Sequence, residues 1–204
     1  MIDTSFDGDL LLLRINRPEK ANSLTRSMLE ALDAAIAGAA SARAIIITGE
    51  GKVFSAGADL EEAHAGLALD PVWERLSGRI AATPCLTIAA LNGTLAGGAM
   101  GMALACDLRL CVPGARFFYP VMKLGFLPQP SDPGRLRALI GPARAKMILM
   151  GGQKIDADEA LRWGLVDRIV APEDILEIAK AIAADSLAAM PNHSAAIKAM
   201  IDKN

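Results

Sequence analysis

The segment from Cys85 to Cys106 constrains the fold most, because it contains no charged residue. It is long enough to span a bilayer, but Asn92-Gly93 and Gly97-Gly98 interrupt it, and the charged sequence Asp-Leu-Arg follows directly. These breaks favour a buried strand, a tight turn and a buried helix over a membrane span. The segment therefore predicts a globular protein built from short apolar elements.

Each of the other apolar segments has the pattern either of a strand or of a helix. Residues 44–48, Ala-Ile-Ile-Ile-Thr, are typical of a strand in a sheet that is covered on both faces. Strands separated by helices require crossover connections and so predict an α/β fold. The expected strands are 10–16, 44–48, 86–91, 107–112 and 165–170. The expected helices begin near 24, at Gly141-Pro142 and at Asp156, and two more occupy 173–189 and 193–203.

Length and composition limit the organisation of the chain. The 204 residues show neither a repeat nor a linker, which predicts one core domain (1–172) with a helical tail (173–204). With 52% hydrophobic residues, 4% aromatic residues and a net charge of −2, the chain resembles neither a disordered nor a nucleic-acid-binding protein. The two histidines and three cysteines lack the spacing of metal ligands, so no metal site is expected. The three cysteines form neither an even set nor a CxxC pair, which predicts a reduced, cytoplasmic setting; no membrane attachment is expected.

Two stretches are too rich in small residues to be ordinary core. Residues 54–59 follow the Ile-rich strand, and residues 92–101 follow the strand at 86–91. In each, glycine lies where a strand ends and a helix begins, so backbone N–H groups are free. Two such groups converging on one point form an oxyanion hole; alternatively, the glycines only allow tight turns. Neither stretch has the spacing of a nucleotide-phosphate loop.

Five segments together resemble the enoyl-CoA hydratase/isomerase family, the crotonases. They follow in the family's order from about residue 8 to 200, and they are 16–22, 54–60, 89–98, 105–107 and 161–167. The resemblance implies an α/β, crotonase-like fold of repeated ββα units and assembly into a homotrimer or hexamer. It also implies an acyl-CoA thioester as substrate in fatty acid metabolism. Coenzyme A then enters as part of the substrate, without a separate cofactor.

The resemblance also assigns site residues. It implies that the backbone N–H groups of Ala58 and Gly98 hold the thioester oxygen. It places the coenzyme A moiety, mostly through backbone atoms, near Lys20, Ala21, Ser55, Ala56, Asp59 and Leu60.

The sequence departs from the family pattern at two positions. The two glutamates that hydratases of this family use fall on Gly101 and Val121, which cannot transfer protons. Isomerisation, decarboxylation or thioester hydrolysis needs the oxyanion hole but not both glutamates. Decarboxylation is attractive because loss of CO₂ forms the enolate without a base, and Lys123 or Arg135 could meet a substrate carboxylate. The alternatives are a non-catalytic acyl-CoA-binding protein and a hydratase with displaced carboxylates.

Four polar residues are candidates to replace the missing glutamates. Asp132 could serve as a base, or it could be the N-cap of a helix starting at Pro133. Glu61 could reach the acyl group, or it could lie on a solvated helix face. Tyr119 could donate a hydrogen bond beside the vacant position, or it could be core. Gln129 could orient a water molecule or face solvent.

Overall fold

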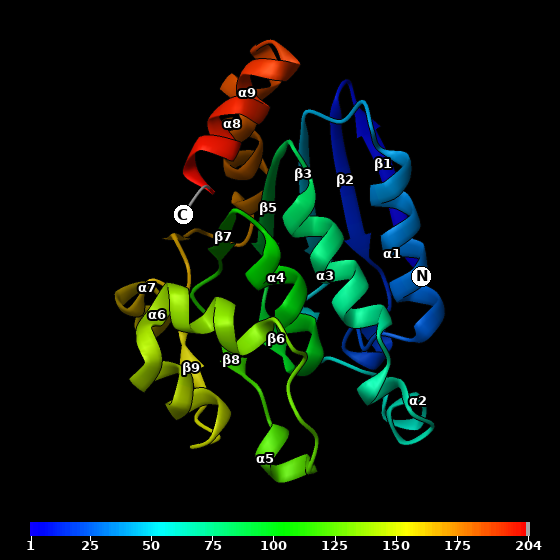
Figure 1. The fold of residues 1–204 in the computed structure, drawn as a ribbon, viewed down its shortest axis with the longest axis vertical. Helices are drawn as coiled ribbons and strands as arrows, with labels where there is room; N and C mark the ends of the chain where they lie inside the picture. The colour runs from blue at the N-terminus through cyan, green and yellow to red at the C-terminus, as the bar shows by residue number, and fades with distance from the viewer. Residues whose placement is uncertain (203–204) are drawn as a thin grey trace.

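Two β-sheets form the centre of the protein, and helices surround them (Figure 1). The computed structural model describes residues 1–202. The larger sheet has the order β1-β2-β3-β5-β7-β10, and the smaller one has the order β4-β6-β8-β9. Strands of the larger sheet are β1 (Ile2–Asp7), β2 (Leu10–Ile15), β3 (Ala44–Gly49), β5 (Leu86–Leu91), β7 (Leu108–Cys111) and β10 (Arg168–Ile169). Strands of the smaller sheet are β4 (Val53–Ser55), β6 (Thr94–Ala96), β8 (Arg116–Phe118) and β9 (Ile155–Asp156).

The chain winds as a spiral that feeds both sheets in turn. In the successive pairs β3–β4, β5–β6 and β7–β8, the first strand joins the larger sheet and the second joins the smaller one. From β2 to β10 the neighbours in the larger sheet are parallel, while β1 pairs antiparallel with β2. A helix follows each pair, so the expected ββα repeat is confirmed.

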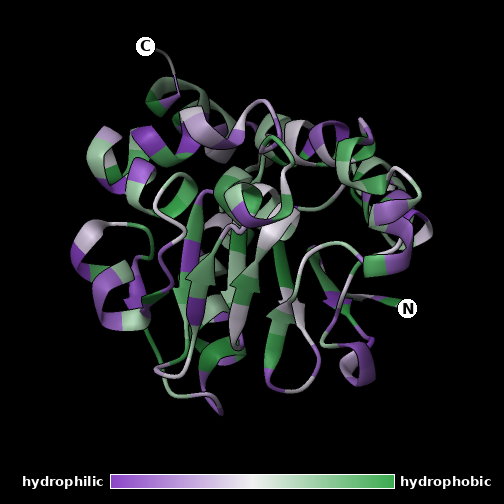
Figure 2. Ribbon diagram, turned by 90° about the horizontal axis from the view of Figure 1, so that it is seen from below, coloured by the Kyte–Doolittle hydropathy of each residue, from purple (hydrophilic) through white to green (hydrophobic). Residues whose placement is uncertain are grey.

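Helices cover both faces of the larger sheet. α1, α3 and α4 pack side by side, while α8 packs against β3, β5 and β7. Figure 2 shows the strands mainly hydrophobic and much of the hydrophilic colour on the helices around them. The helices are α1 (Arg26–Gly38), α2 (Leu60–His64), α3 (Val72–Ala82), α4 (Met100–Ala105), α5 (Val121–Leu124), α6 (Asp132–Leu149), α7 (Ala157–Trp163), α8 (Ile175–Ala188) and α9 (Pro191–Ile201).

The uncharged segment 85–106 forms part of the interior. It supplies β5, a turn at Asn92-Gly93, β6 and the buried helix α4. A Cβ atom on Gly93 would lie 2.0 Å from the carbonyl oxygen of Lys52, so only glycine fits this turn. The expected strand, turn and helix are confirmed, and among residues 1–202 the helices are each too short or too polar to cross a membrane.

Local sequence signals set several helix ends. The side chain of Thr25 accepts a hydrogen bond from the N–H of Met28 at the start of α1, and Asp156 caps α7 in the same way. Gly141, at φ 78° and ψ 164°, breaks α6, so that a new helical segment begins at Pro142. These expected helix starts are confirmed.

The strand expected over 165–170 is wrong in its extent. Its first residue, Leu165, donates its N–H to the carbonyl of Ala160 and so terminates α7. Only Arg168 and Ile169 pair with β7.

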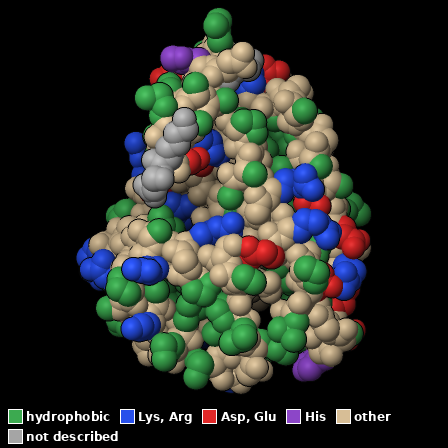
Figure 3. Space-filling model, viewed as in Figure 1, with side chains coloured by type: hydrophobic (Ala, Val, Ile, Leu, Met, Phe, Trp, Pro, Cys, Tyr) green, Lys and Arg blue, Asp and Glu red, His purple; other side chains and the backbone are tan. Residues whose placement is uncertain are grey.

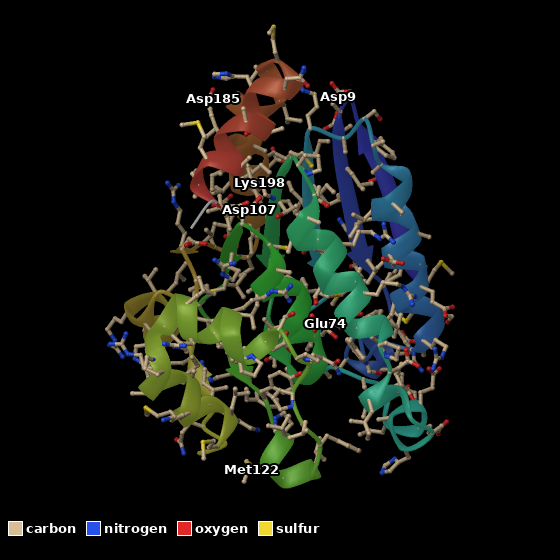
Figure 4. All side chains as sticks on the ribbon, viewed as in Figure 1. Asp9, Glu74, Asp107, Met122, Asp185 and Lys198 are labelled. Carbon is tan, nitrogen blue, oxygen red and sulfur yellow. The ribbon has the colours of Figure 1, made fainter. Side chains whose placement is uncertain are left out.

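A partly buried cation, Lys198, joins the C-terminal helix α9 to the core. Lys198 Nζ donates hydrogen bonds to Asp107 Oδ2 at 2.8 Å and to the carbonyl of Cys85 at 3.0 Å. Figure 4 shows Lys198 and Asp107 side by side. Asp107 also accepts from the N–H of Thr87, so the contact reaches β5.

Candidate functional site

An apolar cavity of about 200 Å³ lies where the two small-residue loops meet α2, α3 and the segment that follows β8. Within the described part of the chain, none of its lining side chains is charged. Figure 3 shows apolar side chains gathered at the lower end of the molecule, where α5 lies. The lining residues are Ala56, Ala58, Leu60, Ala63, Ala68, Trp73, Gly97, Gly98, Tyr119, Pro120, Val121, Leu124, Phe126, Leu127 and Gln129.

Ala58 lies between β4 and α2, and a single parallel bridge to Leu24 fixes its orientation. In this bridge the carbonyl of Gly57 accepts from Leu24, and the N–H of Asp59 donates to Leu24. The bridge therefore uses the neighbours of Ala58 and leaves its own N–H unused. Among residues 1–202 this N–H has no backbone partner, and Ala58 lines the cavity.

Gly98 lies in the 3₁₀ turn Gly97–Ala99, which connects β6 to α4. Ala96 is the N-cap of this turn and Gly98 its second residue, and N–H groups in the first turn of a helix have no acceptor within the helix. A Cβ atom on Gly98 would lie 3.3 Å from ring carbons of Trp73, whose indole packs behind the turn. Sequence analysis missed Trp73, although its helix carries a helical apolar pattern.

Close backbone contact brings the two loops together. Gly57 has φ 93° and Gly97 has φ 57°, conformations that favour glycine. A Cβ atom on Gly57 would lie 2.9 Å from the carbonyl oxygen of Ala96. The loops at Ala58 and Gly98 thus meet at one wall of the cavity.

The residues expected near coenzyme A lie in the loop that contains Ala58 or against it. The N–H of Ala56 donates to the carbonyl of Ala21 at 3.0 Å, which holds the turn after the 3₁₀ helix Pro18–Lys20 against the end of β4. Lys20 and Ala56 are exposed, and Leu60 is 71% exposed. Ser55 is fully buried, and its hydroxyl donates to the carbonyl of Asn22, so its side chain supports the loop.

Asp59 joins these loops electrostatically. Its carboxylate caps α2 by accepting from the N–H groups of Glu61 and Glu62, and Arg17 Nη1 lies 2.8 Å away. The hydrogen bond from Arg17 holds the pKa of Asp59 below its usual value, against a smaller opposing effect of burial. Arg17 was not among the expected site residues, because its partner is 42 residues away.

A hydrogen-bonded pair closes the other side of the cavity. The hydroxyl of Tyr119 donates to Asp132 Oδ2 at 3.0 Å and accepts from the N–H of Gln129 at 3.3 Å. Tyr119 lines the cavity, and Asp132 lies behind it with no exposed surface. Gln129 is also buried, with its amide bound to the carbonyl of Ala68.

Burial dominates the electrostatics of Asp132. It raises the pKa of this carboxyl to about 7, while Tyr119 and Arg135 oppose the rise and Glu74 adds to it. Asp132 Oδ1 and Arg135 Nη1 lie 3.9 Å apart, too far for a hydrogen bond, and both are buried without a partner among the described residues. A carboxyl group of this kind changes its charge near neutral pH.

The interpretation of Asp132 as an N-cap is wrong. Ser131 occupies the N-cap position of α6, and Asp132 is the first helical residue. Its side chain turns inward because Tyr119 supplies a buried donor. It also fills the space next to Gly101, since a Cβ atom on Gly101 would lie 2.8 Å from Asp132 Oδ1.

The remaining polar candidates lie outside the cavity. Glu61 is exposed on α2, and Lys123 is exposed on α5. The buried thiols are poor nucleophiles, since burial raises the pKa of Cys85 to about 11 and those of Cys106 and Cys111 to about 12. Over residues 1–202, no cluster of three His, Cys, Asp or Glu side chains could hold a metal ion.

Comparison with known proteins identifies the class. A family model described as enoyl-CoA hydratase/isomerase matches residues 6–204. The chain is 35% identical over 186 residues to the short-chain-enoyl-CoA hydratase of Clostridium acetobutylicum, covering 87% of this chain and 71% of that protein. It is 36% identical over 193 residues to 4-chlorobenzoyl coenzyme A dehalogenase-1 of an Arthrobacter species, covering 89% and 70%. The crystal structure of an enoyl-CoA hydratase from Bacillus anthracis matches with a TM-score of 0.91 at 30% identity, covering 99% and 82%.

The chain belongs to the enoyl-CoA hydratase/isomerase family. The resemblance seen in the sequence and the crotonase-like fold that it implied are therefore confirmed.

Proposed function

We propose that this protein binds an acyl-CoA thioester and stabilises negative charge on its carbonyl oxygen with the N–H groups of Ala58 and Gly98. The observation that carries the proposal is that both residues line one apolar cavity; the N–H of Ala58 has no backbone partner among the described residues, and the N–H of Gly98 belongs to the first turn of a helix. Preorganised donors of this kind contribute about 2.7–4 kcal/mol each to stabilising an oxyanion. An enolate or a tetrahedral intermediate would receive this stabilisation.

The coenzyme A part of the ligand is proposed to lie along the outer edge of the same loops. Backbone atoms of Ala21, Ser55 and Ala56, together with the exposed side chains of Lys20 and Leu60, offer the contacts. Asp59 supports this edge through Arg17 instead of meeting the ligand with a free carboxylate. The acyl group would then point between Ala58 and Gly98 into the cavity.

The lining of the cavity favours an uncharged acyl group. Decarboxylation of a malonyl-type thioester brings a substrate carboxylate to the site, and a buried carboxylate needs a cationic partner. Lys123 is exposed on α5, and Arg135 lies beside Asp132 without lining the cavity. We therefore favour enolate chemistry on a neutral acyl chain over decarboxylation.

Calorimetric titration tests the proposal. We expect hexanoyl-CoA to bind more tightly than free coenzyme A, because the acyl group buries apolar surface in the cavity. We also expect malonyl-CoA to gain nothing over coenzyme A. Equal affinities for hexanoyl-CoA and coenzyme A, or no binding of either, would contradict the proposal. Tight binding without turnover of any thioester would favour a non-catalytic binding protein.

A further inference from the structure

The carboxyl group of Asp132 occupies the space next to Gly101. A side chain at this position would have to enter the volume that the carboxyl group of Asp132 occupies, since the Cβ atom would approach Oδ1 to 2.8 Å. Gly101 on α4 therefore has no side chain at the place where the carboxyl group of Asp132 lies. This carboxyl group comes from the first residue of α6. Both features lie behind the cavity wall that contains Tyr119.

The two carboxyl oxygens of Asp132 have different surroundings. Oδ2 accepts the hydroxyl of Tyr119, while Oδ1 is fully buried and unpartnered in the described part of the chain. Four groups surround the carboxyl: Tyr119, Arg135 on its own helix, Glu74 on α3 and the backbone around Gly101 on α4. Glu74, labelled in Figure 4, accepts from Ser131 and thereby fixes the start of α6 beside α3.

We propose that Tyr119 and Asp132 act as one acid–base unit that moves a proton between two carbons of the bound acyl group, so that the protein isomerises β,γ-unsaturated acyl-CoA to the α,β-unsaturated form. This inference rests on the function proposed above. A single acid–base unit suffices for isomerisation, because the proton taken from one carbon is the proton given to another. Addition of water needs a second group to activate the water.

The proton transfer balances within the pair. The oxygen of Tyr119 takes the proton from the α-carbon while its own hydroxyl proton passes to Asp132 Oδ2. The electrons of the broken C–H bond form the enolate, whose oxygen lies at the N–H groups of Ala58 and Gly98. In the return step Asp132 reprotonates Tyr119, Tyr119 protonates the γ-carbon, and the double bond moves between the α- and β-carbons.

The cavity suits a substrate of six carbons. A cavity of about 150 Å³ lined by aliphatic and aromatic side chains holds a benzene molecule. The cavity of about 200 Å³ found here has comparable lining and somewhat more room. We therefore choose 3-hexenoyl-CoA as the probe, whose conversion to 2-hexenoyl-CoA is followed by the absorbance of the conjugated thioester.

The decisive experiment compares two variants of the pair with a matched control. Asp132→Asn and Tyr119→Phe should each lower kcat by about 10²–10⁴-fold, the usual contribution of a positioned acid–base group. Their affinity for hexanoyl-CoA should stay that of the wild type. Asp174→Asn, at an exposed position before α8, should leave both quantities unchanged. If Asp132→Asn does not fold, Tyr119→Phe carries the same comparison.

A second comparison tests the placement of the carboxyl group. Gly101→Ala puts a methyl group against Asp132 Oδ1 and should lower kcat without changing affinity, whereas Gly134→Ala adds a methyl group to α6 in open space and should not. The wild-type kcat should rise with pH through an apparent pKa near 7, because the base form starts the reaction, and Asp132→Asn should lose this dependence.

The outcomes separate the inference from the proposed function. Wild-type protein that binds hexanoyl-CoA but leaves 3-hexenoyl-CoA unconverted overturns the inference and retains the binding function. Conversion at wild-type rates by both Asp132→Asn and Tyr119→Phe also overturns it. Failure to bind any CoA thioester contradicts the proposed function itself.

Discussion

The guanidinium group of Arg17 lies 2.8 Å from the carboxylate of Asp59 and joins two loops that are 42 residues apart in the chain. One loop ends at Lys20, and the other leads from Ala58 into α2. The ion pair is partly shielded, with 22% and 13% of the two side chains exposed, so solvent screens it less than a surface pair. This contact therefore helps to hold together the edge that we propose for coenzyme A.

Arg17→Ala should weaken binding of hexanoyl-CoA and of free coenzyme A by the same factor, about tenfold for a loss of 1.4 kcal/mol. The loops would have to be ordered by the ligand, and this cost reduces affinity. Calorimetry checks the result, and Arg14→Ala, which removes a more exposed ion pair to Glu50, is the matched control. An unchanged affinity of Arg17→Ala would show that the loops hold their shape without the ion pair.

Gly98→Pro should lower turnover of 3-hexenoyl-CoA by roughly 10²–10³-fold, because proline has no N–H to donate to the thioester oxygen. The matched control is Gly98→Ala, which keeps the donor and adds a methyl group 3.3 Å from the ring of Trp73. Steady-state rates of the two variants give the comparison. Equal rates would argue that the N–H of Gly98 does not meet the developing charge.

Asp132 should make the protein less stable as the pH rises from about 4 to 7. The folded protein keeps a proton on this carboxyl over that interval, whereas the unfolded chain has released it, so the free energy of unfolding falls with pH. A rise of the pKa from 3.8 to about 7 corresponds to roughly 4 kcal/mol.

Urea unfolding of the wild type and of Asp132→Asn between pH 4 and pH 8 measures this dependence. The variant should lose the part of the slope that Asp132 causes, and Asp174→Asn should keep it. Parallel curves for the wild type and Asp132→Asn would place the pKa of Asp132 near its ordinary value in the folded protein.

Crotonyl-CoA should be hydrated at least about 10²-fold more slowly than by the short-chain-enoyl-CoA hydratase of Clostridium acetobutylicum, because Gly101 and Val121 provide no acid or base for water addition. Loss of the conjugated thioester absorbance measures the rate in both proteins. Hydration at comparable rates would mean that another carboxylate reaches the substrate.

The protein should form a homotrimer or hexamer in solution. Several large apolar side chains are exposed on α6, α7 and α9, among them Met147, Leu161 and Met200, and a partner subunit would cover such surface. Light scattering should give three or six times the 21.4 kDa of one chain. A mass of one chain at micromolar concentration would contradict this prediction.

The parts of the fold that the sequence predicted are those with a strong local pattern. The Ile-rich strand β3 and the uncharged strand β5 are fully or almost fully buried, so their composition alone distinguishes them. β4, β6 and β8 have three residues each, too few for a periodic pattern to emerge. The helix α3 was missed although Val72, Trp73, Leu76 and Ile80 follow a helical period.

The site was predictable where backbone position matters and less so where side chains meet. The glycine-rich turns after strands are visible in the sequence, and the family resemblance pointed to Ala58 and Gly98 within them; both line the cavity. The inward turn of Asp132 depends on Tyr119, 13 residues away, and on the empty space beside Gly101. Such a tertiary contact leaves no local signal, so the N-cap interpretation was the natural one for an aspartate before proline.

The spiral course of the chain has a consequence for how this protein acquires its activity. Ala58 follows β4, Gly98 follows β6 and Tyr119 follows β8, so each successive turn of the spiral contributes one wall of the cavity. No fragment that ends before Gln129 contains the complete cavity, so we expect a nascent or refolding chain to gain affinity for an acyl-CoA only after the segment that follows β8 has packed. A ligand at 100 times its Kd would then stabilise all the turns together, by about 2.7 kcal/mol.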